Sequence, residues 1–207
     1  MGQSGRGIGS PATMLHRASP VRPVYPRANP EFGFPHPEMP TLAQVNAMPA
    51  AEFRAAFGGV FEHSPWVAEG AFAARPFASV DALHAAMTDV AKRAGREEQV
   101  ALLRAHPELA GREAQAGTMT GDSTAEQGGA GLNALSRDEM ARISDLNRRY
   151  REKFGFPFII AVRRHTKDGI FSEFERRLAN DRDTELATCL GQVFVITRLR
   201  LDGLVPG

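Results

Sequence analysis

A single stretch of this sequence has the pattern of a β-strand, and it has no partner. Residues 156–162 read Phe-Pro-Phe-Ile-Ile-Ala-Val, an apolar run of the kind found in buried strands. A lone strand cannot form a sheet, so we expect a buried extended connector there instead. Elsewhere apolar residues recur at helical spacing, as in Leu83, Met87, Val90 and Ala94. The sequence therefore predicts an all-α fold, a compact single-domain helical bundle of about eight helices.

The first 40 residues differ in composition from the rest. They hold 8 of the 14 prolines, which would break any helix, and they lack sustained apolar periodicity. We interpret residues 1–40 as a flexible, disordered Pro/Arg-rich tail and residues 41–207 as one folded domain, which the length of 207 residues allows. An Arg-rich targeting peptide is the alternative for the tail.

Capping signals indicate where several helices begin and end. Ser79 is expected to cap one helix, Ser136-x-x-Glu139 forms a capping box for another, and Gly155 is expected to end that second helix. The last helix carries a broad apolar stripe at positions 186, 189, 190, 193, 196 and 199. Helices are expected over residues 96–105, 123–135, 136–154, 167–179 and 183–201, with a loop over 111–121.

Composition excludes several classes of function. The formal net charge is +1, so no large field of one sign favours a nucleic acid or an anionic membrane as partner. No run of about 18 apolar residues is present to span a bilayer, and the first residues lack the apolar core of a secretory signal. The single cysteine, Cys189, fits a reducing compartment and excludes a cysteine-rich zinc site. We therefore expect a cytoplasmic protein.

Most familiar catalytic motifs are absent. The chain has no glycine-rich nucleotide-binding motif, no His-Glu-x-x-His and no Gly-x-Ser-x-Gly. His106-Pro107-Glu108 matches half of a zinc-deaminase signature, but the cysteine pair of that signature is missing. With only three lysines in the chain, few residues could act through a Schiff base. Three polar stretches remain as candidates for chemistry.

Each of these stretches also has an ordinary structural explanation. His106 stands where a helix should end, and a cation there suits the helix dipole. Ser123-x-x-Glu126 has the form of a capping box, like the box that begins thirteen residues later, and spacing alone favours this structural interpretation. Arg163 precedes Arg164, and such arginines are commonly solvated. Taken singly, none of the three stretches identifies a function.

Taken together, the three stretches form a recognisable combination. They are the His-Pro-Glu-Leu-Ala-Gly segment from His106, the Ser-x-x-Glu-Gln segment from Ser123, and the Phe-Gly-Phe-Pro-Phe segment whose stretch ends in Arg163. In this order they resemble the signature of the 2-oxo-4-hydroxy-4-carboxy-5-ureidoimidazoline (OHCU) decarboxylase family. The Gly-Gly-Val-Phe-Glu-His-Ser-Pro-Trp segment from Gly58 and the closing Arg-Leu-Arg-Leu also resemble that family. The resemblance covers about residues 41–204.

The resemblance implies a role for each matching residue. His106 falls on the catalytic histidine and would act as acid/base, with Glu126 and Arg163 completing the catalytic set. Glu108 stands where many members have Asp, and His63 and Trp66 would lie at the pocket wall or in the nearby core. Substrate contacts are implied for Pro107, Ser123, Gln127, Phe158, Ile159 and Ile160.

The resemblance also implies what accompanies the protein. The partner is a small-molecule substrate, with no nucleic acid, no membrane, no metal and no cofactor. A homodimer and a functional association with hydroxyisourate hydrolase, the preceding enzyme of urate degradation, are carried over by analogy.

The residue types suit the implied reaction. By resemblance, the substrate is a five-membered ring with a carboxylate and a hydroxyl on one carbon, whose own conjugated C=N and C=O can accept the electrons left by CO2. Arg163 can pair with a carboxylate through its planar fork, and Glu126 and Gln127 can bond the ureido group. His106 can move a proton near neutral pH, and a carboxylate at Glu126 would raise its pKa. Whether His106 acts first as base or acid stays open.

Three alternatives remain beside this hypothesis. The chain could be a helical binding module that has lost activity, although all the polar positions are present. It could be a metal-dependent hydrolase built from His63, His106 and Glu126. A purely structural adaptor would explain the capping boxes but not the polar residues that interrupt residues 106–163.

Overall fold

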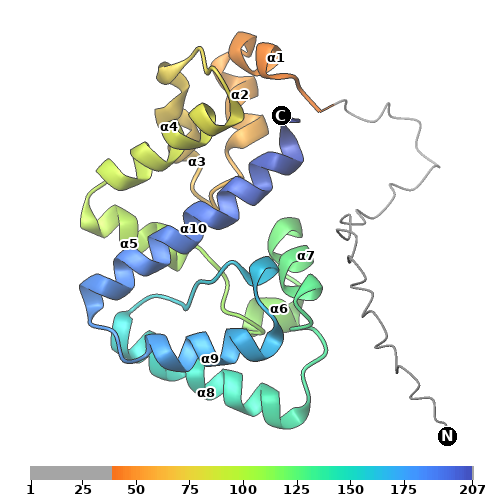
Figure 1. The fold of residues 1–207 in the computed structure, drawn as a ribbon, viewed down its shortest axis with the longest axis vertical. Helices are drawn as coiled ribbons and strands as arrows, with labels where there is room; N and C mark the ends of the chain where they lie inside the picture. Colours follow the sequence, from red (N-terminus) through yellow and green to blue (C-terminus); the bar gives the residue numbers. More distant parts are fainter. Residues whose placement is uncertain (1–38, 207) are drawn as a thin grey trace, which may run out of the picture. The chain divides into compact units, whose positions relative to one another are not determined.

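Ten α-helices and two 3-10 helices make up residues 39–206, the part of the chain that the computed structural model describes (Figure 1). No β-strand occurs in that part, so the predicted all-α class is confirmed. Two helices of six and five residues account for the excess over about eight. The elements are α1 (Leu42–Ala47), α2 (Ala50–Phe57), α3 (Pro65–Ala71), η1 (Phe72–Ala74), α4 (Val80–Arg93), α5 (Arg96–Arg104), α6 (Arg112–Ala116), α7 (Gly121–Gly129), α8 (Arg137–Phe154), η2 (Val162–Arg164), α9 (Lys167–Arg177) and α10 (Arg182–Leu204).

The tail predicted over residues 1–40 lies, but for its last two residues, outside the described part of the chain. Within residues 39–206, no helix combines the length and the apolar character needed to cross a membrane.

The predicted caps fix several helix ends. Ser79 accepts a hydrogen bond from the Ala82 N–H and starts α4, and Ser136 with Glu139 forms a complete capping box at the start of α8. Gly155 follows α8 with a φ of 80°, a left-handed conformation that glycine adopts without a steric penalty. These three signals are confirmed because each depends only on neighbouring backbone groups.

The region between residues 111 and 135 differs from the prediction. Helix α6 occupies part of the expected loop and ends at Gly117, whose φ is 67°. The helix expected over 123–135 begins at Gly121 and ends at Gly129. The cause is Thr120, whose hydroxyl oxygen accepts the Ser123 N–H at 3.3 Å and makes Thr120 the N-cap in place of Ser123.

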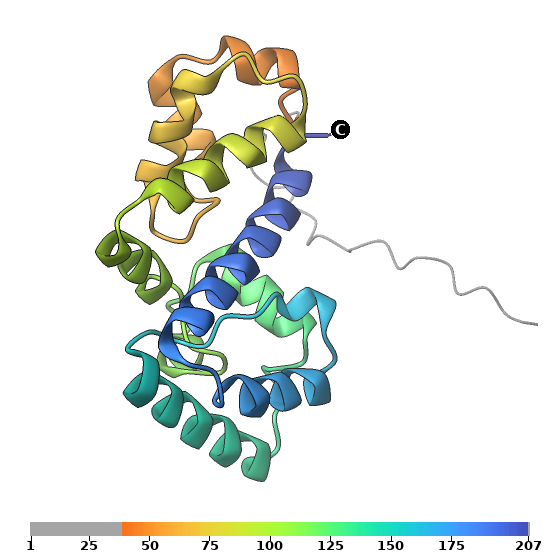
Figure 2. The same ribbon diagram turned by 60° about the vertical axis from the view of Figure 1, so that its left-hand side comes forward.

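Helix α10 is the longest element and organises the rest. It packs against α4, α5 and α8, and both views show it running from the group of α1 to α4 toward α8 and α9 (Figures 1 and 2). Helices α2, α3 and α4 pack on one another beside one half of α10, and α8 packs on α9 beside the other half. Helix α10 therefore connects the two groups of helices, because each group packs against one half of it.

The strand-like stretch is a buried connector between α8 and η2. Residues 157–161 are buried and have no regular secondary structure, as expected for a strand without a partner. Phe158 stacks on Phe174 of α9, with ring centroids 3.9 Å apart, and meets Tyr150 of α8 edge-on at 5.3 Å. Aromatic packing thus holds the connector against α8 and α9.

Candidate active site

A small cavity lies where the end of α5, helix α7, the buried connector and α10 meet. Its empty volume is about 360 Å³. We call residues 158–160 of the connector the wall segment, because all three line the cavity. The complete lining is His106, Pro107, Leu109, Ser123, Glu126, Phe158, Ile159, Ile160, Val162, Ile196 and Arg200. Segments far apart in the sequence therefore converge on one space.

His106 reaches this cavity because α5 ends just before it. The helix stops at Arg104, and Pro107 disfavours helical geometry at the preceding residue. The His106 side chain is buried, with 8% of the residue exposed. Its Nδ1 lies 3.0 Å from the Leu102 carbonyl oxygen, which can only accept, so Nδ1 carries the proton. Nε2 is then the basic nitrogen, and it has no hydrogen-bond partner among the described residues.

The surroundings keep His106 neutral. Burial lowers the pKa of His106 to about 4, and the nearby carboxylate of Glu62 opposes this shift without reversing it. The expectation that Glu126 raises the pKa of His106 is therefore wrong: the carboxylate that acts on the imidazole is Glu62, and burial outweighs it. At neutral pH the buried imidazole is therefore uncharged, with a free lone pair on Nε2.

Ser123 and Glu126 do not form a capping box. Because Thr120 is the N-cap of α7, Ser123 lies one turn inside the helix and Glu126 one turn further, both on the face that lines the cavity. The Ser123 hydroxyl donates to Glu62 Oε1 at 3.0 Å. The interpretation that spacing favoured is wrong here, and the polar side chains of this helix belong to the site.

Arg200 of α10 joins these residues into one network. Its Nε and Nη2 donate to the two carboxylate oxygens of Glu126, each at 3.0 Å, and Nη2 also lies 3.3 Å from Ser123 Oγ. Its Nη1 donates to Glu62 Oε2 at 2.7 Å and to the Val60 carbonyl oxygen at 3.4 Å. Every nitrogen of the guanidinium is thus bonded, which fixes the plane of the Glu126 carboxylate.

Glu62 is the buried counter-ion of this network. The residue is 1% exposed, and its Oε1 accepts a 2.6 Å hydrogen bond from the Thr120 hydroxyl. Burial alone would raise the pKa of Glu62, but the Thr120 hydrogen bond and the Arg200 charge outweigh burial and leave the pKa below its usual value. One guanidinium therefore faces two carboxylates beside a neutral imidazole.

Comparison with known proteins identifies the family of this chain. A sequence model described as OHCU decarboxylase matches residues 46–202. The chain belongs to the OHCU decarboxylase family. An OHCU decarboxylase of Haloferax volcanii is 47% identical over 161 residues, which cover 78% of this chain and 94% of that protein. The enzyme of the same name from Mus musculus is 40% identical over 167 residues, covering 79% and 92%.

A solved structure agrees with this family. The crystal structure described as (S)-allantoin synthase superposes with a TM-score of 0.64 at 29% sequence identity. The match covers 80% of this chain and 54% of that one, so this chain spans about half the length of that protein. The shared fold thus extends over nearly all of the described residues.

The structure brings together most of the residues that the family resemblance pointed to. His106, Pro107, Ser123 and Glu126 line the cavity with the wall segment. Two do not line it. Gln127 is buried without bordering the cavity, and Arg163 lies in η2 and is exposed.

Gln127 supports the loop after His106. Its Oε1 accepts the Ala110 N–H at 2.9 Å, and its Nε2 donates to the Glu108 carbonyl at 3.3 Å. Ala110 has a φ of 49°, a left-handed conformation that costs free energy for a residue other than glycine. Gln127 therefore holds a strained turn in the loop that follows His106.

Sequence reasoning assigned no role to three residues of the network: Glu62, Thr120 and Arg200. The sequence pattern indicated that Arg200 is buried, because the stripe of buried positions on α10 continues from Ile196 to position 200 at a spacing of four. The predicted stripe ended at Leu199, which is only partly buried, whereas Arg200 is buried. A charged residue at a buried position of a helix needs a charged partner nearby, which makes it a candidate for a functional site.

The metal-dependent alternative lacks a ligand set in the described part of the chain. No group of three or more His, Cys, Asp or Glu side chains within residues 39–206 is arranged to hold a metal ion. Glu126 is bonded to Arg200 instead.

Proposed function

We propose that this protein decarboxylates OHCU to (S)-allantoin in urate degradation, without a metal or an organic cofactor. The observation that carries the proposal is the position of His106. His106 lines a small cavity together with Glu126, whose carboxylate Arg200 holds in a fixed plane, and its basic Nε2 has no hydrogen-bond partner among the described residues. Membership of the OHCU decarboxylase family supports the substrate, and the likeness to an (S)-allantoin synthase supports the product.

The tautomer of His106 favours a base as its first role. With the proton on Nδ1, the lone pair of Nε2 can accept the proton of the substrate hydroxyl. The C–C bond to the carboxylate then breaks, CO2 leaves, and the electron pair moves into the conjugated C=N of the ring. The imidazolium formed in this step is disfavoured by burial, so it readily returns its proton to the ring carbon that bears the ureido group, while the former hydroxyl oxygen becomes the carbonyl. The ring nitrogen that received the electron pair takes up one proton from water, which completes neutral allantoin.

The polar network orients the substrate for this proton transfer. Glu126 and Ser123 present hydrogen-bonding oxygens to the cavity, where they can bond the ureido N–H groups. Arg200 and Glu62 keep these two side chains in place. Substrate bound in one orientation meets the His106 proton on one face only, which would yield a single enantiomer of allantoin.

Arg163 is proposed as a rim anchor for the substrate carboxylate. Its helix η2 packs against α7, which carries Glu126, and its exposed side chain is long enough to fold over a bound ligand. The change Arg163→Ala is expected to raise KM more than it lowers kcat. An unchanged KM and rate would remove Arg163 from binding.

The decisive test is turnover of freshly generated OHCU by the purified full-length chain. Loss of substrate absorbance together with optically active allantoin would support the proposal, because the uncatalysed reaction in water has no chiral influence. A rate unchanged by strong chelators would support metal independence. Allantoin binding without turnover would instead identify an inactive binding module and overturn the proposal.

We further propose a cytoplasmic homodimer that acts with hydroxyisourate hydrolase. Both features rest on the family resemblance alone. Light scattering on the purified chain tests the dimer, and co-sedimentation with the hydrolase tests the association.

A further inference from the structure

The wall segment of the cavity has no secondary structure to hold it. It lies within residues 157–161, which belong to no helix or strand, so its backbone groups need partners elsewhere. The Ile160 carbonyl oxygen accepts the Val162 N–H at 2.8 Å, and side chains from other helices hold the groups on either side of it. Arg177 Nη1 donates to the Ile159 carbonyl oxygen at 2.8 Å, and Gln192 Oε1 accepts the N–H of Ala161, the residue after the wall segment, at 2.9 Å.

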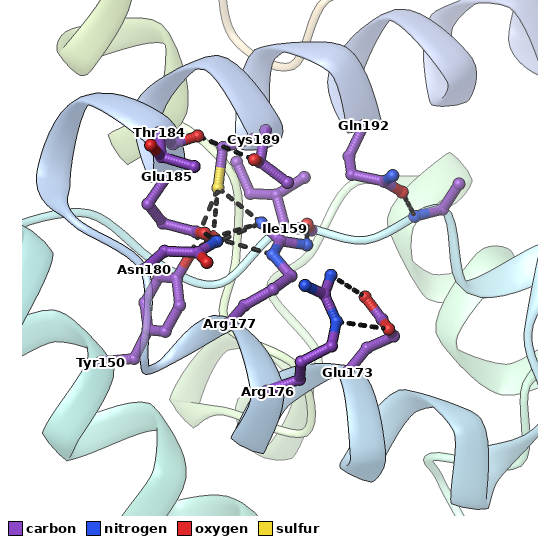
Figure 3. A network of polar contacts seen from close by, with 12 residues as sticks. Tyr150, Ile159, Glu173, Arg176, Arg177, Asn180, Thr184, Glu185, Cys189 and Gln192 are labelled. Atoms are coloured by element: carbon purple, nitrogen blue, oxygen red, sulfur yellow. Dashed lines mark hydrogen bonds and ion pairs between the residues drawn. The ribbon is translucent and has the colours of Figure 1, made fainter.

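Arg177 belongs to a polar cluster behind the wall segment (Figure 3). Its Nε donates to Glu185 Oε1 at 2.8 Å, and the Tyr150 hydroxyl donates to the same oxygen. Asn180 Nδ2 donates to Glu185 Oε2 at 2.6 Å. Arg177 is 1% exposed, Glu185 is fully buried, and neither lines the cavity. The cluster is therefore screened from the substrate by the wall segment.

Stability alone is a weak reason for such a cluster. Burying two charges costs desolvation, and an apolar pair of similar volume is often as stable as a buried ion pair. An apolar side chain could not, however, donate a hydrogen bond to the Ile159 carbonyl. Arg177 also lies with its guanidinium carbon 4.4 Å from the centroid of the Phe158 ring, so it contacts the wall segment at two points.

We propose that Arg177 is a positioning residue for the decarboxylation. By holding the Ile159 carbonyl and the Phe158 ring, it fixes the wall segment so that the substrate meets His106 in one orientation. Glu185 and its donors hold the guanidinium in the plane that this contact needs. The inference rests on the proposed function, since it assigns Arg177 a part in that reaction.

The test removes the charge pair as a unit. In Arg177→Met/Glu185→Leu no buried charge is left unpaired, so the chain is expected to fold and to melt cooperatively. Its kcat is expected to fall about 10- to 100-fold because the wall segment shifts, whereas KM changes less because Glu126, Ser123 and Arg200 remain. The optical purity of the allantoin is expected to fall as well.

Optical purity separates positioning from a simple folding defect. Enzyme concentrations are chosen so that wild type and variant give the same total rate, which makes the spontaneous contribution equal. A misfolded fraction would then leave the optical purity unchanged, whereas a loose wall segment would lower it. Amide hydrogen exchange of residues 158–161 gives a second measure, expected to become faster in the variant without reference to activity.

A matched control lies on the same helix. Arg176, the residue before Arg177, pairs with Glu173 three residues earlier, but their side chains are 60% and 33% exposed (Figure 3). Arg176→Met/Glu173→Leu is expected to keep the kinetics, the optical purity and the exchange of residues 158–161. If the buried double variant fails to fold, Arg177→Lys serves in its place, because an ammonium can pair with Glu185 but lacks the fork that also reaches Ile159.

The outcomes are distinct. An active wild type with reduced optical purity and faster exchange in the folded variant supports the inference. An active wild type with a folded variant of unchanged kcat, optical purity and exchange overturns it and leaves the proposed function intact. A wild type without turnover would overturn the proposed function and, with it, any part for Arg177 in this reaction.

Discussion

Two buried arginines organise this protein, and they differ in what their partners face. Arg200 bonds the buried Glu62 and also holds Glu126 at the cavity, which the neutral imidazole of His106 lines as well. Arg177 holds Glu185 behind the cavity, closed off by aromatic side chains. Both arginines are almost fully buried, at 7% and 1% exposure. Burial and pairing are therefore common to both networks, and the difference between them is that Arg200 and its partner Glu126 line the cavity.

The largest expected effect tests the cavity side of this comparison. His106→Asn keeps a polar side chain of similar shape but cannot act as a base, so kcat is expected to fall about 10² to 10⁴-fold with little change in melting temperature. His84→Asn is the matched control, because the His84 ring bonds the Thr197 hydroxyl and does not line the cavity. Near-normal turnover of His106→Asn would exclude His106 from the mechanism.

The two single arginine variants sharpen the comparison directly. Arg177→Met leaves Glu185 buried without a counter-ion and is expected to cost about 3–5 kcal/mol of unfolding free energy. Arg200→Met likewise leaves Glu62 buried without its counter-ion, so it should cost a similar amount of unfolding free energy. It should cost more activity than Arg177→Met, because Arg200 also holds Glu126 at the cavity. Urea unfolding and steady-state kinetics on both variants check this. A larger loss of activity in Arg177→Met would mean that the roles of the two networks have been assigned wrongly.

The pH dependence of stability isolates the imidazole. The folded-state pKa of His106, about 4, lies below its unfolded value of about 6.5, so the unfolded chain binds the proton more readily. The contribution of His106 to stability is therefore complete above pH 6.5 and is lost as pH falls toward 4, by up to about 3 kcal/mol. Across this pH range, the free energy of unfolding should depend less steeply on pH in His106→Asn than in the wild type. An identical slope in both proteins would contradict a buried neutral histidine.

The sequence was sufficient to predict those features of the fold that depend only on neighbouring residues. The Ser136 box, the Gly155 stop and the unpaired strand-like stretch all follow from local geometry, and all three are present. The network at the cavity depends on contacts across long stretches of chain. Arg200 bonds Glu62, 138 residues away, and no spacing rule connects them. The family resemblance reached His106 and the wall segment, but it could not supply their partners.

Helix α6 and the start of α7 show the same limit on a smaller scale. Ser123 matched the capping rule, but Thr120, three residues earlier, took the cap. Both residues suit that position by type. Both hydroxyls donate to the buried Glu62, a tertiary contact that the local pattern does not contain, and only the Thr120 hydroxyl also accepts a backbone N–H at the start of α7.

The smallest expected effects come from the two Ser-x-x-Glu motifs, which differ only in what they contact. Ser136→Ala removes an exposed cap and should cost about 1 kcal/mol of unfolding free energy without changing kcat or KM. Ser123→Ala should cost a similar amount, but it also removes a donor to Glu62 and a contact to Arg200, so kcat/KM should fall by about 10-fold. Chemical unfolding and kinetics on the pair check this. Equal kinetics in both variants would show that Ser123 is a structural residue after all, and that the cavity face of α7 acts through Glu126 alone.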